Sequence, residues 1–308
     1  MSDISIFWPS TGFWYFDYIL DGIIEVSGME EVRTKSFNSF KKFLEIKDIT
    51  FFGWNYLIMA SFTVDQKNYY DENAEKFEER IFFGRANRNH LKKIQKICEL
   101  LNLKNNNRSE FCILEIGAGT GLHAQYVTRQ FANVRYIGLD ISEKMLYQAQ
   151  KKFRSDNLEN WNFFVGDGNL LPFRSNSFDA VYISGSLHHF PDPFKGFEEV
   201  YRTVKPDGTI VMMEPNWLFP LNFFHGCFNR IEHNILKMRK RNFMRWASRL
   251  KLSSVNIENF IYTPPLSFID TKILDRIDQI LGKIPVISSF SIMIYLSARK
   301  INKKEKFQ

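Results

Sequence analysis

The sequence has 308 residues, of which 44% are hydrophobic and 24% charged, a balance typical of a folded globular protein. No apolar run reaches the roughly 20 residues needed to span a bilayer, and the first residues lack the basic and apolar regions of a signal peptide. Three separated cysteines without a CxxC pair argue against a disulfide framework or a zinc knuckle. We therefore expect a cytoplasmic protein.

The first part of the chain has no clear pattern. Residues 1–65 are rich in aromatic side chains without a sustained period, so we treat them as an N-terminal extension of unknown role. Residues 54–64 form an apolar stretch that we interpret as a strand or a buried segment. A helix is predicted over residues 86–103, because Leu91, Ile94, Ile97 and Leu101 recur at helical spacing.

From residue 111, short apolar runs alternate with longer amphipathic ones. The predicted strands cover residues 111–116, 134–139, 161–165, 178–184 and 209–214, and the predicted helices cover 122–131, 143–153 and 194–204. This alternation predicts an α/β fold with a Rossmann-like parallel sheet and helices on both faces. After residue 215 we expect a basic helical stretch, a strand over 255–262, a helix over 270–281 and a strand over 290–298.

The positive charge is concentrated near the C-terminus. Residues 217–308 hold 16 of the 41 basic residues but 6 of the 34 acidic ones. Such a surplus suits an anionic substrate, a membrane surface or nucleic acid, and a solvated helix face is the simpler alternative. The basic cluster consists of Lys237, Arg239, Lys240, Arg241, Arg245, Arg249 and Lys251.

A glycine-rich turn follows the first predicted strand, where Gly117, Gly119 and Gly121 are spaced as GxGxG. Glycine is needed where the backbone turns tightly and a ligand approaches main-chain atoms too closely to leave room for a Cβ. Close packing of helix on sheet also produces glycine turns. A nicotinamide dinucleotide favours GxGxxG, and Glu115 would lie badly beside a pyrophosphate.

Two carboxylates follow the next two strands. Asp140 ends the second strand, where an acidic residue accepts hydrogen bonds from both hydroxyls of a ribose; capping of the next helix is the alternative. Asp167 ends the third, where it can accept the exocyclic amine of adenine while the Gly168 amide donates to a ring nitrogen. A single adenosine could therefore contact the glycine turn, Asp140 and Asp167 together.

These motifs, in this order, resemble the class I S-adenosylmethionine-dependent methyltransferases, specifically the group similar to the ubiquinone and menaquinone biosynthesis enzymes. The resemblance covers about residues 67–215 and rests on residues 114–121, 138–142, Asp167 with 171–173 and 177–181, and 187–190 with 204–208. It implies a seven-stranded sheet whose last strand is antiparallel, and a methyltransferase core over 66–216. Residues 217–308 then form an acceptor cap and the last strands.

The resemblance also implies S-adenosylmethionine as cofactor and a set of residues that bind it. The segment around Tyr70 is expected to fold over the methionine end, with ordinary helix packing as the alternative. The predicted cofactor residues are Tyr70, Glu115, Gly117, Ala118, Gly119, Gly121, Asp140, Ile141, Met145, Asp167, Gly168 and Ser184.

His188 and His189 follow the fourth strand, at the sheet edge where ligands bind, and are the candidates for a base that takes a proton from the acceptor. Glu214, at the end of the fifth strand, is expected to orient one imidazole. A purely structural histidine pair is the alternative. His225 and His233 match no standard ligand spacing, so no metal is predicted.

Our leading hypothesis is a methyltransferase acting at oxygen or carbon of a small-molecule, sugar-linked or lipid-linked acceptor, with possible peripheral membrane contact through the basic region. Trp217, Phe219, Phe223, Phe224 and Phe228 are candidates to line the acceptor pocket or to pack in the core. The alternatives are an RNA or protein methyltransferase, which lacks an Asn-Pro-Pro-Tyr-type motif here, and a cofactor-binding regulator without acceptor chemistry. Nucleic acid is therefore not the expected partner, and the sequence does not specify an oligomeric state.

Overall fold

The computed structural model of the chain describes residues 50–78, 87–105, 108, 110–264, 266 and 269–302. The chain consists of two compact units, residues 1–58 and 59–308. Within the first unit the described part is residues 50–58, which begin helix α3 (Thr50–Asn73). Most of the predicted N-terminal extension, residues 1–49, lies outside the described residues.

Helix α3 covers the apolar stretch 54–64, which was interpreted as a strand or a buried segment. The strand interpretation is wrong, because these residues are helical along their whole length. Phe, Trp, Tyr and Ile favour strands locally, but an apolar run without clear alternation does not distinguish a strand from a helix. The helix ends at Asn73 and is followed by the short 3-10 helix η2 (Ala74–Lys76).

A seven-stranded sheet forms the centre of the second unit, with the strand order β3-β2-β1-β4-β5-β7-β6. Strand β7 pairs antiparallel with both β5 and β6, and the pairs among the first five strands are parallel. The predicted α/β class, the parallel core and the antiparallel last strand are confirmed. The strands are β1 (Phe111–Ile116), β2 (Val134–Asp140), β3 (Trp161–Val165), β4 (Phe178–Ser184), β5 (Val204–Pro215), β6 (Ser253–Phe260) and β7 (Met293–Arg299).

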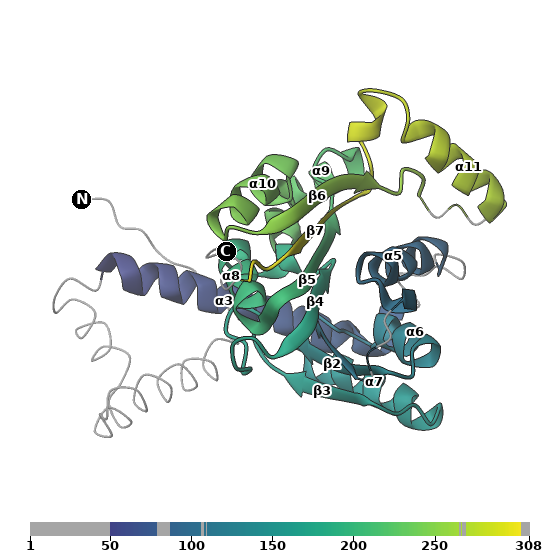
Figure 1. The fold of residues 1–308 in the computed structure, drawn as a ribbon. Coiled ribbons are helices and arrows are strands. Elements are labelled where there is room, and N and C mark those ends of the chain that lie inside the picture. The colour runs from purple at the N-terminus through teal and green to yellow at the C-terminus, as the bar shows by residue number, and fades with distance from the viewer. Residues whose placement is uncertain are drawn as a thin grey trace, which may run out of the picture. The chain divides into compact units, whose positions relative to one another are not determined.

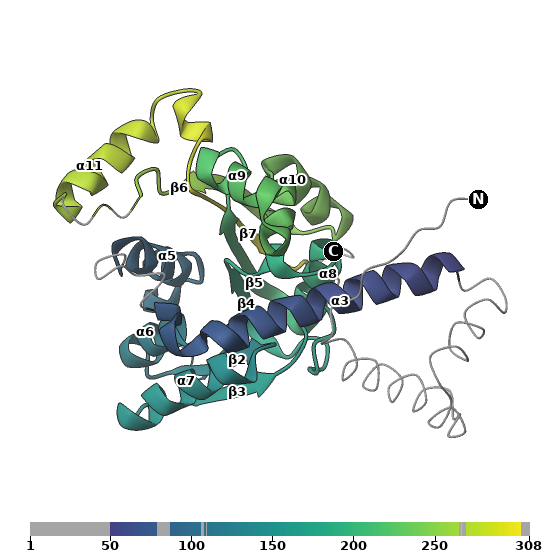
Figure 2. The same ribbon diagram turned by 180° about the vertical axis from the view of Figure 1, so that it is seen from behind.

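Helices cover both faces of this sheet (Figures 1 and 2). Helices α5 (Asn87–Leu100), α6 (Leu122–Gln130) and α7 (Glu143–Ser155) lie on one face. Helices α8 (Pro193–Thr203) and α10 (Lys240–Arg249) lie on the other. These helices occupy the predicted positions within a few residues. Two further helices are α9 (Pro220–Phe228) and α11 (Thr271–Leu281).

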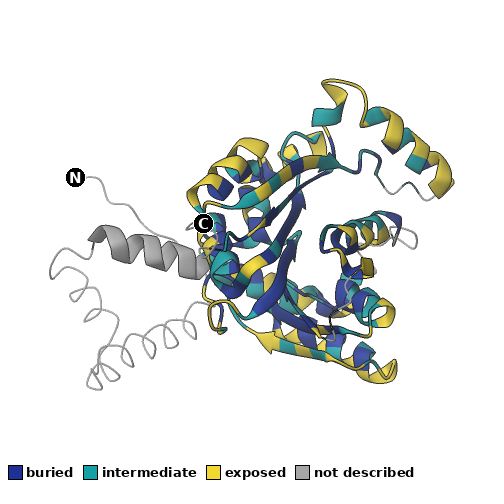
Figure 3. Ribbon diagram, viewed as in Figure 1, coloured by how far each residue is buried: buried dark blue, intermediate teal, exposed yellow. Residues whose placement is uncertain are grey.

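The core has two parts because alternate residues of each strand face opposite sides of the sheet. Leu114 and Ile116 pack toward Phe197 of α8 and Trp246 of α10, whereas Ile113 packs with the α5 and α6 side. Strands β1, β2, β4, β5 and β7 are accordingly buried along most of their length, whereas the edge strands β3 and β6 are mostly exposed or half-buried (Figure 3). No helix in the described residues is long and apolar enough to cross a membrane.

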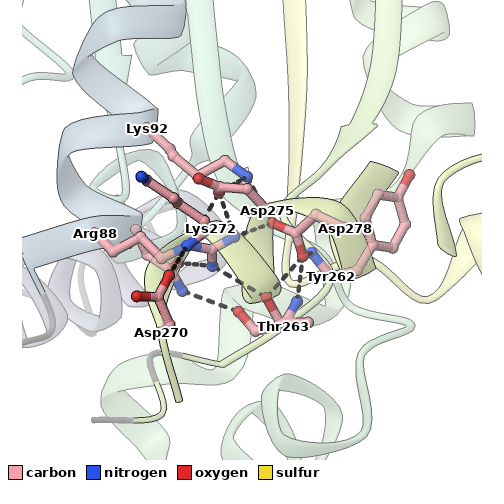
Figure 4. Close-up of polar contacts among 9 residues, drawn as sticks. Arg88, Lys92, Tyr262, Thr263, Asp270, Lys272, Asp275 and Asp278 are labelled. Carbon is pink, nitrogen blue, oxygen red and sulfur yellow. Dashed lines mark hydrogen bonds and ion pairs between the residues drawn. The ribbon is translucent and has the colours of Figure 1, made fainter. Parts of the chain in front are cut away.

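A buried ion-pair cluster ties α5 to α11 (Figure 4). Arg88 and Lys92 of α5 bind Asp278 at 2.7 and 2.6 Å, and the side chains of Arg88 and Asp278 are each only 6% exposed. Asp278 also accepts hydrogen bonds from the amide and hydroxyl of Thr263, both at 2.8 Å. The more exposed Asp275 pairs with both cations. This cluster holds α5, whose residues Asn89, His90 and Lys93 line the pocket described next.

Candidate functional site

A pocket of about 340 Å³ lies where β1, β2, β3 and β4 end. Parallel strands present their carboxyl ends at one edge of the sheet, so the segments that follow them meet there. These segments form one wall of the pocket, and helices α3 and α5 with the 3-10 turn η4 (Leu187–His189) form the rest. The residues contributed by the helices and the turn include Thr63, Gln66, Tyr70, Asn89, His90, Lys93 and His189.

Nearly all of the predicted cofactor residues line this pocket. They are Tyr70, Glu115, Gly117, Ala118, Gly119, Asp140, Ile141, Met145, Asp167, Gly168 and Ser184. Gly121 is the exception, because it does not line the pocket. It precedes α6 with a φ of +75°, and a Cβ there would lie 2.9 Å from that of Ala149, so this glycine serves packing of helix on sheet.

Gly117 shows why the turn needs glycine. Its φ is +78°, in the left-handed region, and its amide donates to the carbonyl of Leu139 at 2.7 Å. A Cβ at this position would lie 2.2 Å from the Ser186 hydroxyl. Since real Cβ contacts are never this short, any other residue would move the turn that borders the pocket.

Asp140 is held in place by the backbone. Its two carboxylate oxygens accept hydrogen bonds from the amides of Gly119 at 2.8 Å and Ser142 at 2.9 Å. Ser142, rather than Asp140, caps α7 by accepting from the Met145 amide. Burial raises the pKa of Asp140 to about 6 despite these amides. Each oxygen keeps a second lone pair for a ligand hydroxyl.

Asp167 and Gly168 lie two and three residues after β3 rather than within it, and both line the pocket. One oxygen of Asp167 accepts from the Asn169 amide at 2.8 Å. A Cβ on Gly168 would lie 2.2 Å from the ring of Phe190, another pocket residue. The lack of a side chain at Gly168 therefore lets the phenyl ring close over this end of the pocket.

Glu115 lines the pocket, but both of its carboxyl oxygens already make hydrogen bonds within the protein. One oxygen pairs with Nδ1 of His123 at 2.8 Å, and the other accepts from the hydroxyl of Tyr136. Tyr136 in turn contacts the hydroxyl of Tyr182 at 2.7 Å. Burial raises the pKa of Glu115 to about 8. Both Glu115 and His123 line the pocket.

The two histidines predicted as bases have different environments. His188 does not line the pocket; its Nδ1 lies 2.5 Å from Glu214 and its Nε2 lies 3.1 Å from Glu232. Burial opposes charge on His188, but the two carboxylates raise its pKa to about 9. A pKa raised above neutrality and a position outside the pocket lining both argue against His188 as the group that takes a proton from the acceptor.

Glu214 contacts His188 as expected, but it also lies outside the pocket lining. Its carboxylate accepts from the amides of Ser186 and Leu187 at 3.2 and 3.0 Å. Glu214 and His188 together therefore hold the η4 turn, and they act on the pocket through the position of that turn.

His189 does line the pocket, where its Nε2 lies 2.6 Å from the hydroxyl of Tyr70. Its Nδ1 lies 3.4 Å from the carbonyl of Ile231, which only accepts, so Nδ1 carries the proton and Nε2 accepts from Tyr70. Burial and the neighbouring His188 lower the pKa of His189 to about 4. The pair offers the pocket a neutral hydroxyl backed by a neutral imidazole.

His188, His189 and Glu232 place three potential metal ligands within 4.8 Å of one another. Neither His225 nor His233 belongs to this group. Its atoms already make hydrogen bonds, His188 with Glu232 and His189 with Tyr70. The positions of these three side chains are thus explained by the hydrogen bonds that they make.

The aromatic residues that were candidates for the acceptor pocket do not line the pocket described here. These are Trp217, Phe219, Phe223, Phe224 and Phe228, and the last three are exposed. One side of this pocket is built by α3 and α5, and Thr63, Gln66 and Tyr70 share one face of α3 at spacings of three and four. The spacing of Thr63, Gln66 and Tyr70 could have predicted that they share a helix face. It was not used because residues 1–65 are rich in aromatic side chains and show no sustained period.

Comparisons with known proteins agree with this geometry. A family model described as a methyltransferase domain matches residues 114–212. A ubiquinone/menaquinone biosynthesis C-methyltransferase of Rickettsia typhi is 29% identical over 196 residues, which are 61% of this chain and 70% of that protein. A demethylmenaquinone methyltransferase of Lactobacillus johnsonii is 37% identical over 33% of this chain, and the chain spans only 42% of its length.

Solved structures show the same fold. A geranyl diphosphate C-methyltransferase from Streptomyces coelicolor A3(2), solved with Mg²⁺, geranyl diphosphate and S-adenosyl-L-homocysteine, has a TM-score of 0.57 at 15% identity. The match covers 78% of this chain and 98% of that one. A putative sarcosine dimethylglycine methyltransferase from Galdieria sulphuraria has a TM-score of 0.51 at 16% identity, covering 68% and 86%.

Proposed function

Because the chain belongs to the class I S-adenosylmethionine-dependent methyltransferases, we propose that it methylates carbon or oxygen of a small, lipid-linked or sugar-linked acceptor that carries a hydroxylated ring. This proposal rests on one observation. The same cavity is lined by the strand-end residues that suit an adenosyl group and by the hydrogen-bonded pair Tyr70 and His189. The names of the matched relatives, C-methyltransferases of quinone biosynthesis, support a ring acceptor.

The residues present fit the cofactor. The hydroxyls of Thr120 and Ser184 are buried at the pocket without a hydrogen-bond partner among the described residues, so each has capacity for a ligand. Asp140 is suited to the ribose, and Asp167 with the Gly168 amide to the adenine. When bound, S-adenosylmethionine supplies a methyl group on an activated sulfonium.

The chain itself then has to align the acceptor, exclude water and receive a proton. Alignment of two reactants can supply about 7 to 11 kcal/mol of the barrier, so positioning by the pocket walls is the main contribution. The oxygen of Tyr70 can accept a hydrogen bond from an acceptor hydroxyl while its own proton is held by His189. This arrangement gives the acceptor proton a path to the imidazole.

The acceptor class is tested by incubating the purified chain with methyl-labelled S-adenosylmethionine and cell extract, then separating lipid, protein and RNA. We expect the label in an organic extract, and addition of a polyprenylated hydroquinone to increase it. Label that precipitates with protein or RNA would instead favour the macromolecular alternative. Tight cofactor binding without label in any fraction would favour the regulator.

The Tyr70→Phe variant tests the proton path. The ring is kept and one neutral hydrogen bond is lost, so we expect kcat/KM for a hydroxylated acceptor to fall about tenfold, with unchanged cofactor affinity. Initial-rate kinetics and calorimetry measure the two quantities. An exposed tyrosine, Tyr147, provides the control Tyr147→Phe. Unchanged turnover of Tyr70→Phe would contradict a role in proton transfer.

We also propose that the region after β5 brings the enzyme to an anionic membrane surface. Leu221, Phe224 and Phe228 of α9 are 65%, 55% and 84% exposed. Figures 1 and 2 show α10 beside α9, and every residue of the basic cluster is exposed. Exposed apolar side chains next to basic ones are typical of interfacial helices.

Sedimentation with vesicles tests the membrane contact. The chain should bind phosphatidylglycerol-containing vesicles and bind phosphatidylcholine vesicles weakly, because each basic residue near an anionic surface contributes about 1 kcal/mol. The double variant Phe224→Ser, Phe228→Ser should reduce this binding several-fold, since it removes apolar area. Equal binding to both vesicle types would argue against the proposal.

A further inference from the structure

One end of the pocket carries polar groups that the fold leaves unused. Lys93 of α5 lines the pocket and forms no hydrogen bond or ion pair with the described residues. His123 of α6 lines it too, only 7% exposed, and its Nε2 has no hydrogen-bond partner among those residues. Buried polar atoms without partners are rare in folded proteins and call for a ligand or water.

The neighbours of Lys93 on α5 show how unusual it is. Figure 4 shows Arg88 and Lys92 bound to Asp275 and Asp278, so both charges are compensated within the fold. Lys96, one turn further along, pairs with Glu99 at 2.8 Å. Lys93 faces the pocket instead, where burial lowers its pKa while Glu214 and Glu115 oppose that change. An anion in the pocket would stabilise this ammonium.

His123 offers the complementary group. When Glu115 is ionised, its carboxylate accepts Nδ1–H of His123 at 2.8 Å, and the Nε2 lone pair is left to accept a hydrogen bond. Burial raises the pKa of Glu115 to about 8, and a cation bound at Nε2 would favour the ionised form. His90 stacks on the imidazole with ring centroids 4.6 Å apart, so the ring is held in its plane. Lys93 and His123 thus supply a cationic donor and an acceptor at one end of one cavity.

We propose that Lys93 and His123 form the subsite for an α-amino-acid zwitterion, in which the Lys93 ammonium binds the carboxylate and His123 Nε2 accepts from the α-ammonium. The inference rests on the proposed function, because the zwitterion is the methionine end of the cofactor. Glu115 then acts through His123: it fixes the tautomer and stabilises the added positive charge.

The sheet order explains why this end of the pocket receives the amino acid. Asp167 and Asp140 follow β3 and β2, and β1 and β4 come next in the sheet. Neighbouring strands are about 4.8 Å apart, so a ligand whose adenosine lies over β3 and β2 extends toward β1, where Glu115 and the α5 and α6 residues lie. Tyr70 and His189 line the same pocket and hydrogen-bond each other at 2.6 Å, and we assign them to the acceptor rather than to the methionine end, where the family resemblance placed Tyr70.

Calorimetry with two ligands tests the subsite. S-adenosylhomocysteine contains the amino-acid group, and methylthioadenosine shares the adenosine and thioether without it. We expect Lys93→Met to weaken S-adenosylhomocysteine binding about tenfold and to leave methylthioadenosine binding unchanged within twofold, since one charge-assisted hydrogen bond is lost. Lys93→Arg should recover part of the affinity. Lys96→Met, on the same helix, is the matched control and should match the wild type.

His123→Asn is the second variant; it shortens the side chain and should also weaken S-adenosylhomocysteine selectively. Unchanged affinity of Lys93→Met for S-adenosylhomocysteine would overturn the proposal, even if the KM for the acceptor rose, because the anion would then belong to the acceptor. An equal loss for both ligands would also overturn it, since the amino-acid group would not be involved. A wild-type chain that binds neither ligand would contradict the proposed function itself.

Discussion

Replacing Asp278 with alanine should lower the free energy of unfolding by about 3 to 5 kcal/mol, the range for removing one partner of a buried ion pair. The variant leaves Arg88, 6% exposed, without its buried carboxylate, and Thr263 loses the acceptor of its amide and hydroxyl. Urea unfolding followed by tryptophan fluorescence measures the loss. A change below about 1 kcal/mol would show that the cluster does not stabilise the fold.

Asp275→Ala is the matched control within the same cluster. Its side chain is 46% exposed, and exposed ion pairs contribute about 1 kcal/mol or less. The pKa of Asp278 is lowered because Lys92, Thr263 and Arg88 bind the carboxylate strongly enough to outweigh burial. The stability from Asp278 is therefore complete above its unfolded pKa of about 4 and is lost as the pH falls through the lower folded value.

Replacing Asp140 with alanine should weaken S-adenosylmethionine binding about 100-fold or more. Two hydrogen bonds from ribose hydroxyls to a charged acceptor are lost, each contributing about 1.5 to 3 kcal/mol. The Gly119 amide, which lies in the glycine turn, also loses its acceptor at 2.8 Å. Calorimetric titration measures the change. Equal binding by the variant would contradict the assignment of Asp140 to the ribose.

The same site should give a pH dependence. Burial raises the pKa of Asp140 to about 6, and only the ionised form accepts two ligand hydroxyls while holding both amides. Between pH 7 and pH 5 the ionised fraction falls about tenfold, and the affinity should fall with it. Asp140→Asn, which does not titrate, should bind weakly at both values. A wild-type affinity that is constant over this range would contradict the role of the carboxylate.

The cofactor side of the pocket could be predicted because it depends on strand ends. Gly117, Asp140 and Asp167 each follow an apolar run, and parallel topology brings such ends to one edge without any knowledge of side-chain packing. The seven-stranded order and the antiparallel last strand followed from the family resemblance. Nothing in the comparisons tests the individual site residues, so their roles stay predictions.

The other parts of the site could not be predicted, because they depend on contacts between segments that are far apart in the sequence. Glu232 of the 3-10 helix η5 (Arg230–Lys237) helps Glu214 to raise the pKa of His188, and nothing in the local sequence of His188 indicates this second partner. The local sequence around Lys93 and His123 is that of ordinary helix residues, since only the packing of α5 and α6 against the sheet places them at the pocket. The aromatic residues of α9 were candidates for the acceptor pocket because of their composition. Composition does not show whether a helix turns such residues toward a pocket or toward solvent.

The position of β7 has a consequence for how the chain matures during synthesis. This strand is made after β5 and β6 but pairs between them, and α11, which holds α5 through Asp278, also precedes β7 by only a short segment. A ribosome-bound chain that has released β1 to β5 therefore contains the residues that we assign to adenosine but lacks the ion pairs between α5 and α11. Ligand binding should thus become possible only late in translation, once the final strand is available to complete the sheet.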